Sequence, residues 1–203
     1  MNARHMALLE ELGAHATSHS RRTLLDHLLG THDLLVDWEN EPDVCVAGLF
    51  HSIYGTYAFD KQSADMSMRD EIRDVIGADA ERLVYIFCVT DRRCFYEHLG
   101  EARFCLRDIV HDRDLKLDRD TLAALIEIEV ANILDQVPHR SKKKARRAAE
   151  WYGDAFARGR DYISPLAAGA TERCFNAVLR DRAGASLYFS GDSLRIFNGV
   201  RLD

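Results

Sequence analysis

The chain of 203 residues is 47% hydrophobic and 30% charged, and its formal net charge is −6 at pH 7. This balance is typical of a soluble globular protein, and the negative net charge argues against generalised nucleic-acid binding. No run reaches the roughly 18 apolar residues of a membrane-spanning helix, and the N-terminus lacks the apolar core of a signal peptide. Five scattered cysteines without a CxxC pair favour reduced thiols. We therefore expect a cytoplasmic protein that does not associate with membranes.

Apolar residues recur at helical spacing over most of the chain and predict a mainly α-helical fold. Helices are expected, in chain order, over residues 5–13, 21–38, 44–50, 67–76, 80–90 and 121–137. Pro42 suits the first position of the third of these helices, and Gly77 and Pro138 mark helix ends. Residues 57–66 and 107–120 are predicted to be irregular connectors.

The last third of the chain is predicted to add two helices, over about 140–157 and 167–182, and a small β-hairpin. The hairpin strands are expected at 186–189 and 194–197, on either side of a Gly-Asp turn. We therefore expect a helical domain over residues 1–138 that carries the site, with residues 139–203 packed on it. The hairpin either covers the core or completes a homodimer, and the sequence leaves both open.

Lysine and arginine residues crowd the start of the predicted helix over 140–157, where cations oppose the helix dipole. A solvated surface patch is the common explanation for such a cluster. Nucleic-acid binding is the weakest alternative, because no aromatic residue interrupts the cluster before Trp151.

Two histidines in apolar helical segments are the strongest candidates for chemistry. His27 lies inside the apolar stripe of the second predicted helix, and His51 follows a buried-looking helix 24 residues further along. Imidazole is a common ligand of zinc, iron and manganese, but a metal site needs three or four convergent donors. From spacing alone, a pair of core histidines that bond to the backbone or to each other is the more common explanation, and half of a metal site is the alternative.

A third helix must supply any oxygen donor. Asn132 is a polar residue within an apolar run, where a buried amide must find a partner. Glu129 lies three residues earlier and shares part of the same helix face. We predict His27, His51 and Asn132 as metal ligands, with Glu129 as the most plausible replacement carboxylate.

These residues resemble a known family. Asp26-His27 together with residues 47–56, which read AGLFHSIYGT, resembles the HD superfamily, especially the hydrolase domain of bifunctional guanosine tetraphosphate synthetase/hydrolases. There a first histidine precedes an HD dipeptide by about two dozen residues, and a later Ala-Asp lies in an apolar helix. The resemblance covers roughly residues 15–137. It implies an HD-like orthogonal helical bundle, with His27 and His51 as ligands and the final aspartate within residues 128–135.

The departures from the family bear directly on activity. Ser52 stands where the family has the aspartate of HD, and Ala131-Asn132 stands where it has Ala-Asp. Both anionic ligands are therefore neutral, and the affinity for a divalent ion should fall. The run GLFHSxYGT also resembles the signature of an uncharacterised helical domain family. This second resemblance implies a fold and no activity.

Other polar residues are predicted to line the same pocket. Tyr54, Glu129 and Arg92 are the catalytic candidates, and the substrate-binding candidates are His19, Arg22, Ser52, Thr56 and Arg93. The literal dipeptide His111-Asp112 lies in a charged connector and is not expected to bind metal. His32 and His98 would be needed as extra ligands for iron, although both are expected to be exposed helix residues.

Three functions follow from these observations and stay open. The first is a metal-dependent enzyme that binds Mn, Fe or Zn and hydrolyses a small substrate, phosphorylated or a nucleotide. The second is a non-haem iron oxygenase on the same helices, since the family resemblance extends to inositol oxygenase. The third is a degenerate, non-catalytic module that binds a ligand or a protein through the pocket in which HD enzymes hold their metal.

Overall fold

The computed structural model describes residues 2–19, 22–56, 62–101 and 106–180. These residues form nine α-helices and two small antiparallel sheets, so the expected mainly α fold is confirmed. The helices are α1 (Ala3–Glu11), α2 (Leu24–Asp37), α3 (Pro42–Phe50), α4 (Arg69–Ile76), α5 (Ala78–Val89), α6 (Arg92–Glu97), α7 (Arg119–Gln136), α8 (Lys142–Arg158) and α9 (Pro165–Arg180). The sheets pair β1 (Ser18–His19) with β2 (Arg22–Thr23), and β3 (Leu106–Asp108) with β4 (Arg113–Leu115).

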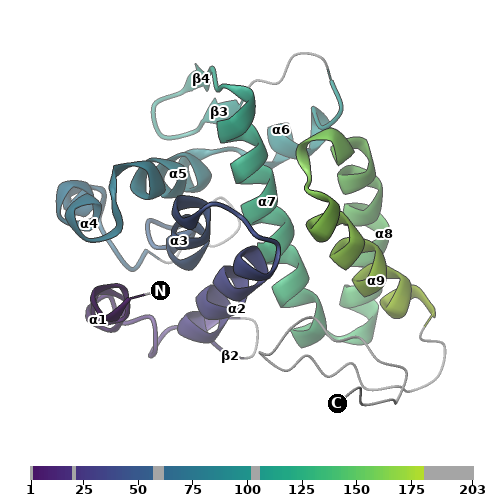
Figure 1. Cartoon of the computed structure of the whole chain (residues 1–203), viewed down its shortest axis with the longest axis horizontal. Helices are drawn as coiled ribbons and strands as arrows, with labels where there is room; N and C mark the ends of the chain where they lie inside the picture. The colour runs from purple at the N-terminus through teal and green to yellow at the C-terminus, as the bar shows by residue number, and fades with distance from the viewer. Residues whose placement is uncertain (1, 20–21, 57–61, 102–105, 181–203) are drawn as a thin grey trace.

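Helix α7 is the central element of the fold. It runs through the middle of the molecule, with α2, α3 and α5 on one side and α8 and α9 on the other (Figure 1). Its apolar side chains contact both groups of helices, so most of its length is buried. Because α7 contacts α2 and α3, polar residues on α7 meet the two histidine-bearing segments in the core.

Local sequence signals set the start of the site helices. The Thr23 side chain accepts the backbone N–H of Asp26, whose carboxylate in turn accepts the backbone N–H of Thr23, a reciprocal cap that begins α2. Pro42 occupies the first turn of α3, where its missing N–H costs nothing. The second helix therefore begins three residues later than predicted, because residues 22–23 pair as a strand.

Two glycines allow the site helices to pack closely. A Cβ placed on Gly30 of α2 would overlap the Asp135 carboxylate on α7, and one on Gly48 of α3 would overlap the Leu35 side chain of α2. A side chain at either position would therefore require Asp135 or Leu35 to move. The two glycines let α2, α3 and α7 come together at the level of the histidines.

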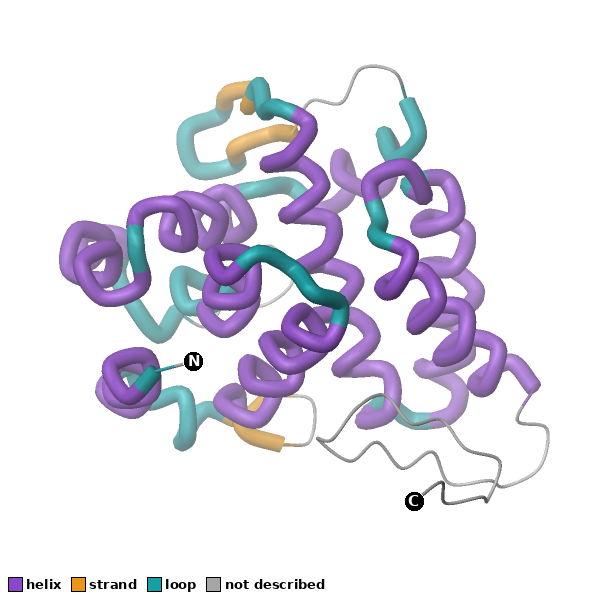
Figure 2. The backbone as a smooth tube through the Cα atoms, viewed as in Figure 1, coloured by secondary structure: helices purple, strands orange, loops and turns teal. Residues whose placement is uncertain are grey.

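The expected connector over residues 107–120 is wrong in part, because it holds the β3–β4 hairpin (Figure 2). Asp108 is buried at the start of the turn and accepts the backbone N–H groups of Val110 and His111. The exposed Arg107 pairs with Asp112 and Asp114 on the hairpin. The charged residues that indicated a solvated connector therefore stabilise a turn. Hydrophobic periodicity does not detect contacts of this kind.

Helix α6 was not among the helices expected from the sequence. The predicted hairpin over 186–197 lies outside the described residues. Helices α8 and α9 pack against one another, and α9 also packs on α7. No helix in the described part of the chain is long and apolar enough to cross a membrane.

Candidate metal centre

The two histidines predicted from the sequence meet in the core. His27 on α2 and His51 directly after α3 are both almost completely buried, and their Nε2 atoms lie 3.2 Å apart. The two rings are nearly perpendicular, at 83°. Phe87 of α5 packs edge-on against the His51 ring, and the Cys88 thiol donates to the His51 carbonyl oxygen. Three helices therefore fix the position of this pair.

The other nitrogen of each ring has a partner that only accepts hydrogen bonds. His51 Nδ1 lies 2.7 Å from the Gly48 carbonyl oxygen, and His27 Nδ1 lies 2.5 Å from Asp135 Oδ2. Carbonyl and carboxylate oxygens accept hydrogen bonds, and Asp135 is nearer to His27 Nδ1 than the Arg22 guanidinium, which lies 3.5 Å away. We therefore assign a proton to Nδ1 of each ring. In the neutral tautomers both Nε2 atoms then present lone pairs to one another. A cation between them, either a proton or a metal ion, removes that repulsion.

Asp135 is the functional residue that the sequence-based ligand set lacks. Its carboxylate also pairs with Arg22, so one carboxylate connects the Arg22 guanidinium to the His27 ring. Metal-bound histidines usually donate their second N–H to a carboxylate or a backbone carbonyl, and this pair does both. The available signal was an acidic residue near the end of the apolar run on α7, one turn beyond Ala131. The contact between Asp135 and His27 depends on how α7 packs against α2, and the spacing of residues along one helix does not reveal that packing.

The donor geometry fits a single bound ion. Two nitrogens about 2.05 Å from one tetrahedral ion lie about 3.3 Å apart, and the Nε2 separation is 3.2 Å. The Ser52 hydroxyl, next to His51 in sequence, is buried without a hydrogen-bond partner among the described residues. That orphaned oxygen suits an additional donor or a bound water. The described residues contain no cluster of three or more histidine, cysteine or acidic side chains.

The structure gives Asn132 a different role from the predicted ligand. Its amide nitrogen donates to Glu129 Oε2 at 3.0 Å, and its amide oxygen accepts from Gln136 at 2.6 Å. Glu129 also accepts the Tyr96 hydroxyl. Asn132 and Glu129 therefore form a hydrogen-bonded row along one face of α7, while Asp135 points to His27. These contacts do not join Asn132 to the histidine pair, because neighbouring positions on a helix can face different partners, and its role as a ligand stays a prediction.

Tyr54, a predicted catalytic residue, is part of a separate buried network. Its hydroxyl donates to Glu81 Oε1 at 3.2 Å, and Arg69 forms two further hydrogen bonds with the same carboxylate. Burial raises the pKa of Tyr54, and the adjacent Glu81 charge raises it further. A phenol held protonated against a buried carboxylate links α4 and α5 to the loop after His51. Its observed contacts are structural.

The remaining candidates divide into three groups. Arg22 contacts Asp135 and the His27 Nδ1 edge, so it lies at the histidine pair, and Thr56 is half-buried after the His51 turn. The side chains of His19, Arg92 and Arg93 lie outside the described residues. His32 is buried instead of exposed and bonds to Asp33, whereas His98 bonds to Glu101 at the surface and His111 lies in the exposed β3–β4 turn.

Comparison with known proteins adds a family without an assigned activity. Residues 8–92 match a family described as a domain of unknown function, DUF6817. The matched segment includes His27, His51 and the run from Gly48 to Thr56, and it ends before α7. No curated protein and no solved structure matches the chain. The match agrees with the expected uncharacterised family and carries no reaction, so function must be argued from the site.

Proposed function

We propose that His27 and His51 bind one divalent metal ion, of manganese, iron or zinc, and that the protein is a metal-dependent hydrolase of a small phosphorylated or nucleotide substrate. The observation that carries the proposal is the pair of Nε2 atoms 3.2 Å apart, each on a ring whose Nδ1 is held by an acceptor. The resemblance of His27 and His51 to the HD histidines supports the reaction class.

The chain's own residues have distinct roles in this proposal. His27 and His51 are the ligands, Asp135 and the Gly48 carbonyl orient their rings, and Arg22 pairs with Asp135. The neutral Ser52 leaves the site with less negative charge than an HD site, so binding should be weaker and exchangeable. A bound divalent ion would supply Lewis acidity and an activated water. Glu129 accepts the Tyr96 hydroxyl and Tyr54 donates to Glu81, and the proposal assigns neither Glu129 nor Tyr54 a step in the reaction.

A core pair that shares one proton is the competing explanation, because a proton also relieves the contact between the two Nε2 atoms. It corresponds to the degenerate, non-catalytic module. The oxygenase alternative needs further imidazole ligands, but His32 and His98 bond to Asp33 and Glu101 instead. The observed partners therefore favour a two-histidine site over a histidine-rich iron site.

Metal analysis separates these explanations. Protein purified without chelator or nickel resin is analysed for bound elements and titrated with Mn²⁺, Fe²⁺ and Zn²⁺ by calorimetry. We expect one ion per chain, lost in His27→Ala and His51→Ala and retained in the matched surface control His98→Ala. Thermal melting checks that each variant folds, and His51→Gln serves if the alanine variants do not. A folded wild-type chain that binds none of the three ions refutes the proposal.

Activity is tested separately on the metal-loaded protein. Release of phosphate from a panel of phosphate monoesters, diesters and nucleotides is measured with and without the bound ion. Metal-dependent turnover that disappears in His51→Gln supports the hydrolase. Metal binding without turnover on any substrate keeps the metal site and excludes this reaction class, and oxygen consumption by the iron form would favour the oxygenase.

A further inference from the structure

A second site lies at the start of α8, away from the histidine pair. A cavity of about 750 Å³ opens between the end of α7 and the first turns of α8. Its lining residues are Gln136, His139, Arg140, Ser141, Lys144, Arg147, Ala148, Trp151 and Tyr152. Three of these side chains are permanent cations, and none of the described lining residues is a carboxylate. Such a cavity is positively charged although the whole chain carries −6.

Helix geometry directs the cations and an aromatic ring to the same cavity. Lys144, Arg147 and Trp151 are spaced i, i+3 and i+7 on α8, so they occupy one helix face. No ion-pair partner is found for Lys144 or Arg147 among the described residues. Arg146, on a different face, is instead paired with Glu150 at 3.0 Å. The two cations that face the cavity are thus available to an anion.

The opposite wall positions a third cation. Arg140 donates to Gln136 Oε1 at 3.0 Å, and Gln136 donates in turn to Asn132. This row continues to Glu129, which accepts from Asn132. The hydrogen bonds fix the Arg140 guanidinium beside the cavity without neutralising it through a direct ion pair. A planar guanidinium held in this way suits bidentate contact with phosphate.

Trp151 gives the cavity an aromatic platform. The ring packs edge-on against Tyr96 and Tyr152, each with ring centroids 4.7 Å from it, yet 53% of the residue is exposed. An exposed ring that neighbouring rings hold in place suits stacking with a planar ligand. The cavity therefore offers stacking and phosphate recognition side by side.

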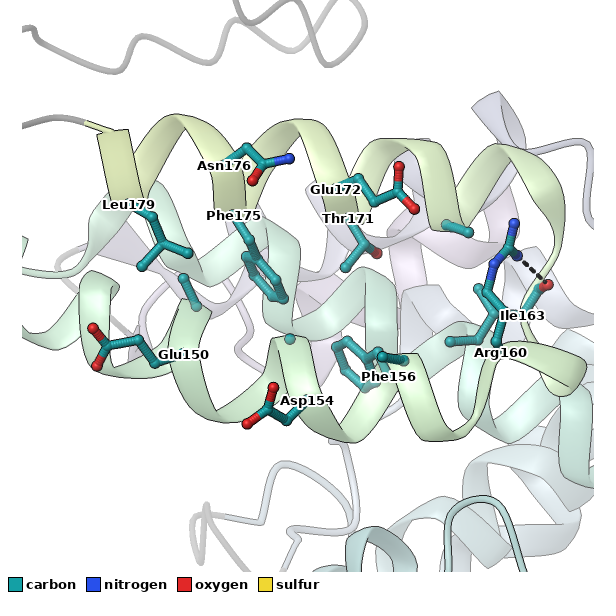
Figure 3. A pocket seen from close by; sticks show the side chains of 14 residues that line it. Glu150, Asp154, Phe156, Arg160, Ile163, Thr171, Glu172, Phe175, Asn176 and Leu179 are labelled. Atoms are coloured by element: carbon teal, nitrogen blue, oxygen red, sulfur yellow. Dashed lines mark hydrogen bonds between the residues drawn. The ribbon is translucent and has the colours of Figure 1, made fainter.

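We infer that this cavity binds a nucleoside polyphosphate, with its base stacked on Trp151 and its phosphates on Arg140, Lys144 and Arg147. Its volume lies within the range of small-molecule sites. The neighbouring hollow between α8 and α9 differs in charge, since its lining carries three carboxylates, Glu150, Asp154 and Glu172, and one cation, Arg160, near the stacked Phe156 and Phe175 rings (Figure 3).

Tryptophan fluorescence gives a direct readout. The chain has two tryptophans, and Trp38 is buried, so Trp38→Phe leaves the exposed Trp151 as the only reporter. Titration with ATP or GTP should quench this fluorescence and saturate, and added salt should weaken binding. Tripolyphosphate keeps only the phosphates of ATP and adenosine keeps only its nucleoside, so each should bind more weakly than ATP.

Matched double variants test the assignment of the cations. Lys144→Ala/Arg147→Ala removes two cavity cations, whereas Lys143→Ala/Arg146→Ala removes the same charge from outside the cavity. We expect the first pair to weaken ATP binding at least tenfold, by calorimetry, and the second less than about threefold. Trp151→Leu should weaken ATP binding roughly 5- to 150-fold, the range for loss of one stacked base, and leave tripolyphosphate binding unchanged.

Several results would overturn the inference. Equal losses in the two double variants would reduce the site to nonspecific charge, and equal affinity for ATP and tripolyphosphate would make it an anion site without base recognition. Binding of a single-stranded oligonucleotide but not of ATP would identify an extended nucleic-acid surface instead. This inference is independent of the metal site, because His51→Gln should leave ATP quenching unchanged.

Discussion

Replacement of Asp135 by asparagine is the sharpest test of how the histidine pair is held. The carboxylate accepts from His27 Nδ1 and pairs with Arg22, and its side chain is only 7% exposed. Asparagine keeps the shape and an acceptor oxygen but loses the charge, and charge-assisted hydrogen bonds are roughly twice as strong as neutral ones. The His27 ring should therefore be a weaker and less oriented ligand.

The expected effect on metal binding is a 10- to 100-fold loss of affinity, about 1.4–2.7 kcal/mol, the range for residues that orient a ligand. Removing one partner of a buried pair costs about 3–5 kcal/mol of stability. The Arg22 side chain is 16% exposed and retains some hydration, so we expect Asp135→Asn to lower the unfolding free energy by about 2 kcal/mol.

Calorimetric titration with Mn²⁺ or Zn²⁺ and urea unfolding measure the two quantities on the same protein. Asp33→Asn is the matched control, because Asp33 is exposed and bonds to a different histidine, His32. Unchanged metal affinity in a folded Asp135→Asn variant would refute the orienting role. Complete loss of binding would instead make Asp135 a direct ligand.

Three further outcomes follow from buried groups. Arg69→Met leaves the Glu81 carboxylate, 1% exposed, without its two Arg69 hydrogen bonds, and should lower the unfolding free energy by about 3 kcal/mol in urea. An unchanged unfolding free energy would contradict a stabilising role for this ion pair. Burial alone would raise the pKa of Asp108, but the hydrogen bonds of the turn outweigh burial and lower the pKa. The Asp108 carboxylate therefore stabilises the folded protein above about pH 4, and this stabilisation is lost as pH falls. Wild type should therefore lose more stability than Asp108→Asn between pH 5 and pH 3 in thermal melts, and parallel curves would contradict this. Burial raises the pKa of Cys45 to about 11 and that of Cys174 to about 12, so mass mapping after iodoacetamide at pH 8 should find both unmodified until the protein unfolds.

The helices were predictable because their signals are local. Apolar spacing, the Pro42 start, the Gly77 end and the Pro138 stop each act within one or two turns of a helix, so the sequence places α3, α4, α5 and α7 to within a few residues. The β3–β4 hairpin was missed because it depends on a buried carboxylate that satisfies its own turn. The spacing of apolar residues does not indicate that contact.

The site was predictable in part for the same reason. His27 and His51 lie on apolar helices joined by a short turn, and antiparallel packing of α2 and α3 brings their rings together. The sequence pointed to the third helix through Asn132, whereas the carboxylate that contacts His27 belongs to Asp135 on the same helix. Asn132 and Asp135 are less than one turn apart, and only the angular position of α7 against α2 decides which one reaches His27.

The sequence by itself determined the helical class, the two histidines and the neutral residue at position 52, because each is a property of the residues or of their local spacing. The tertiary structure alone decided that Asp135 bonds to His27, that Tyr54 donates to Glu81, and that Lys144 and Arg147 line one cavity with Trp151. These are contacts between segments far apart in the chain or between helix faces. They depend on the rotation and approach of whole helices, which the close contacts at Gly30 and Gly48 help to set.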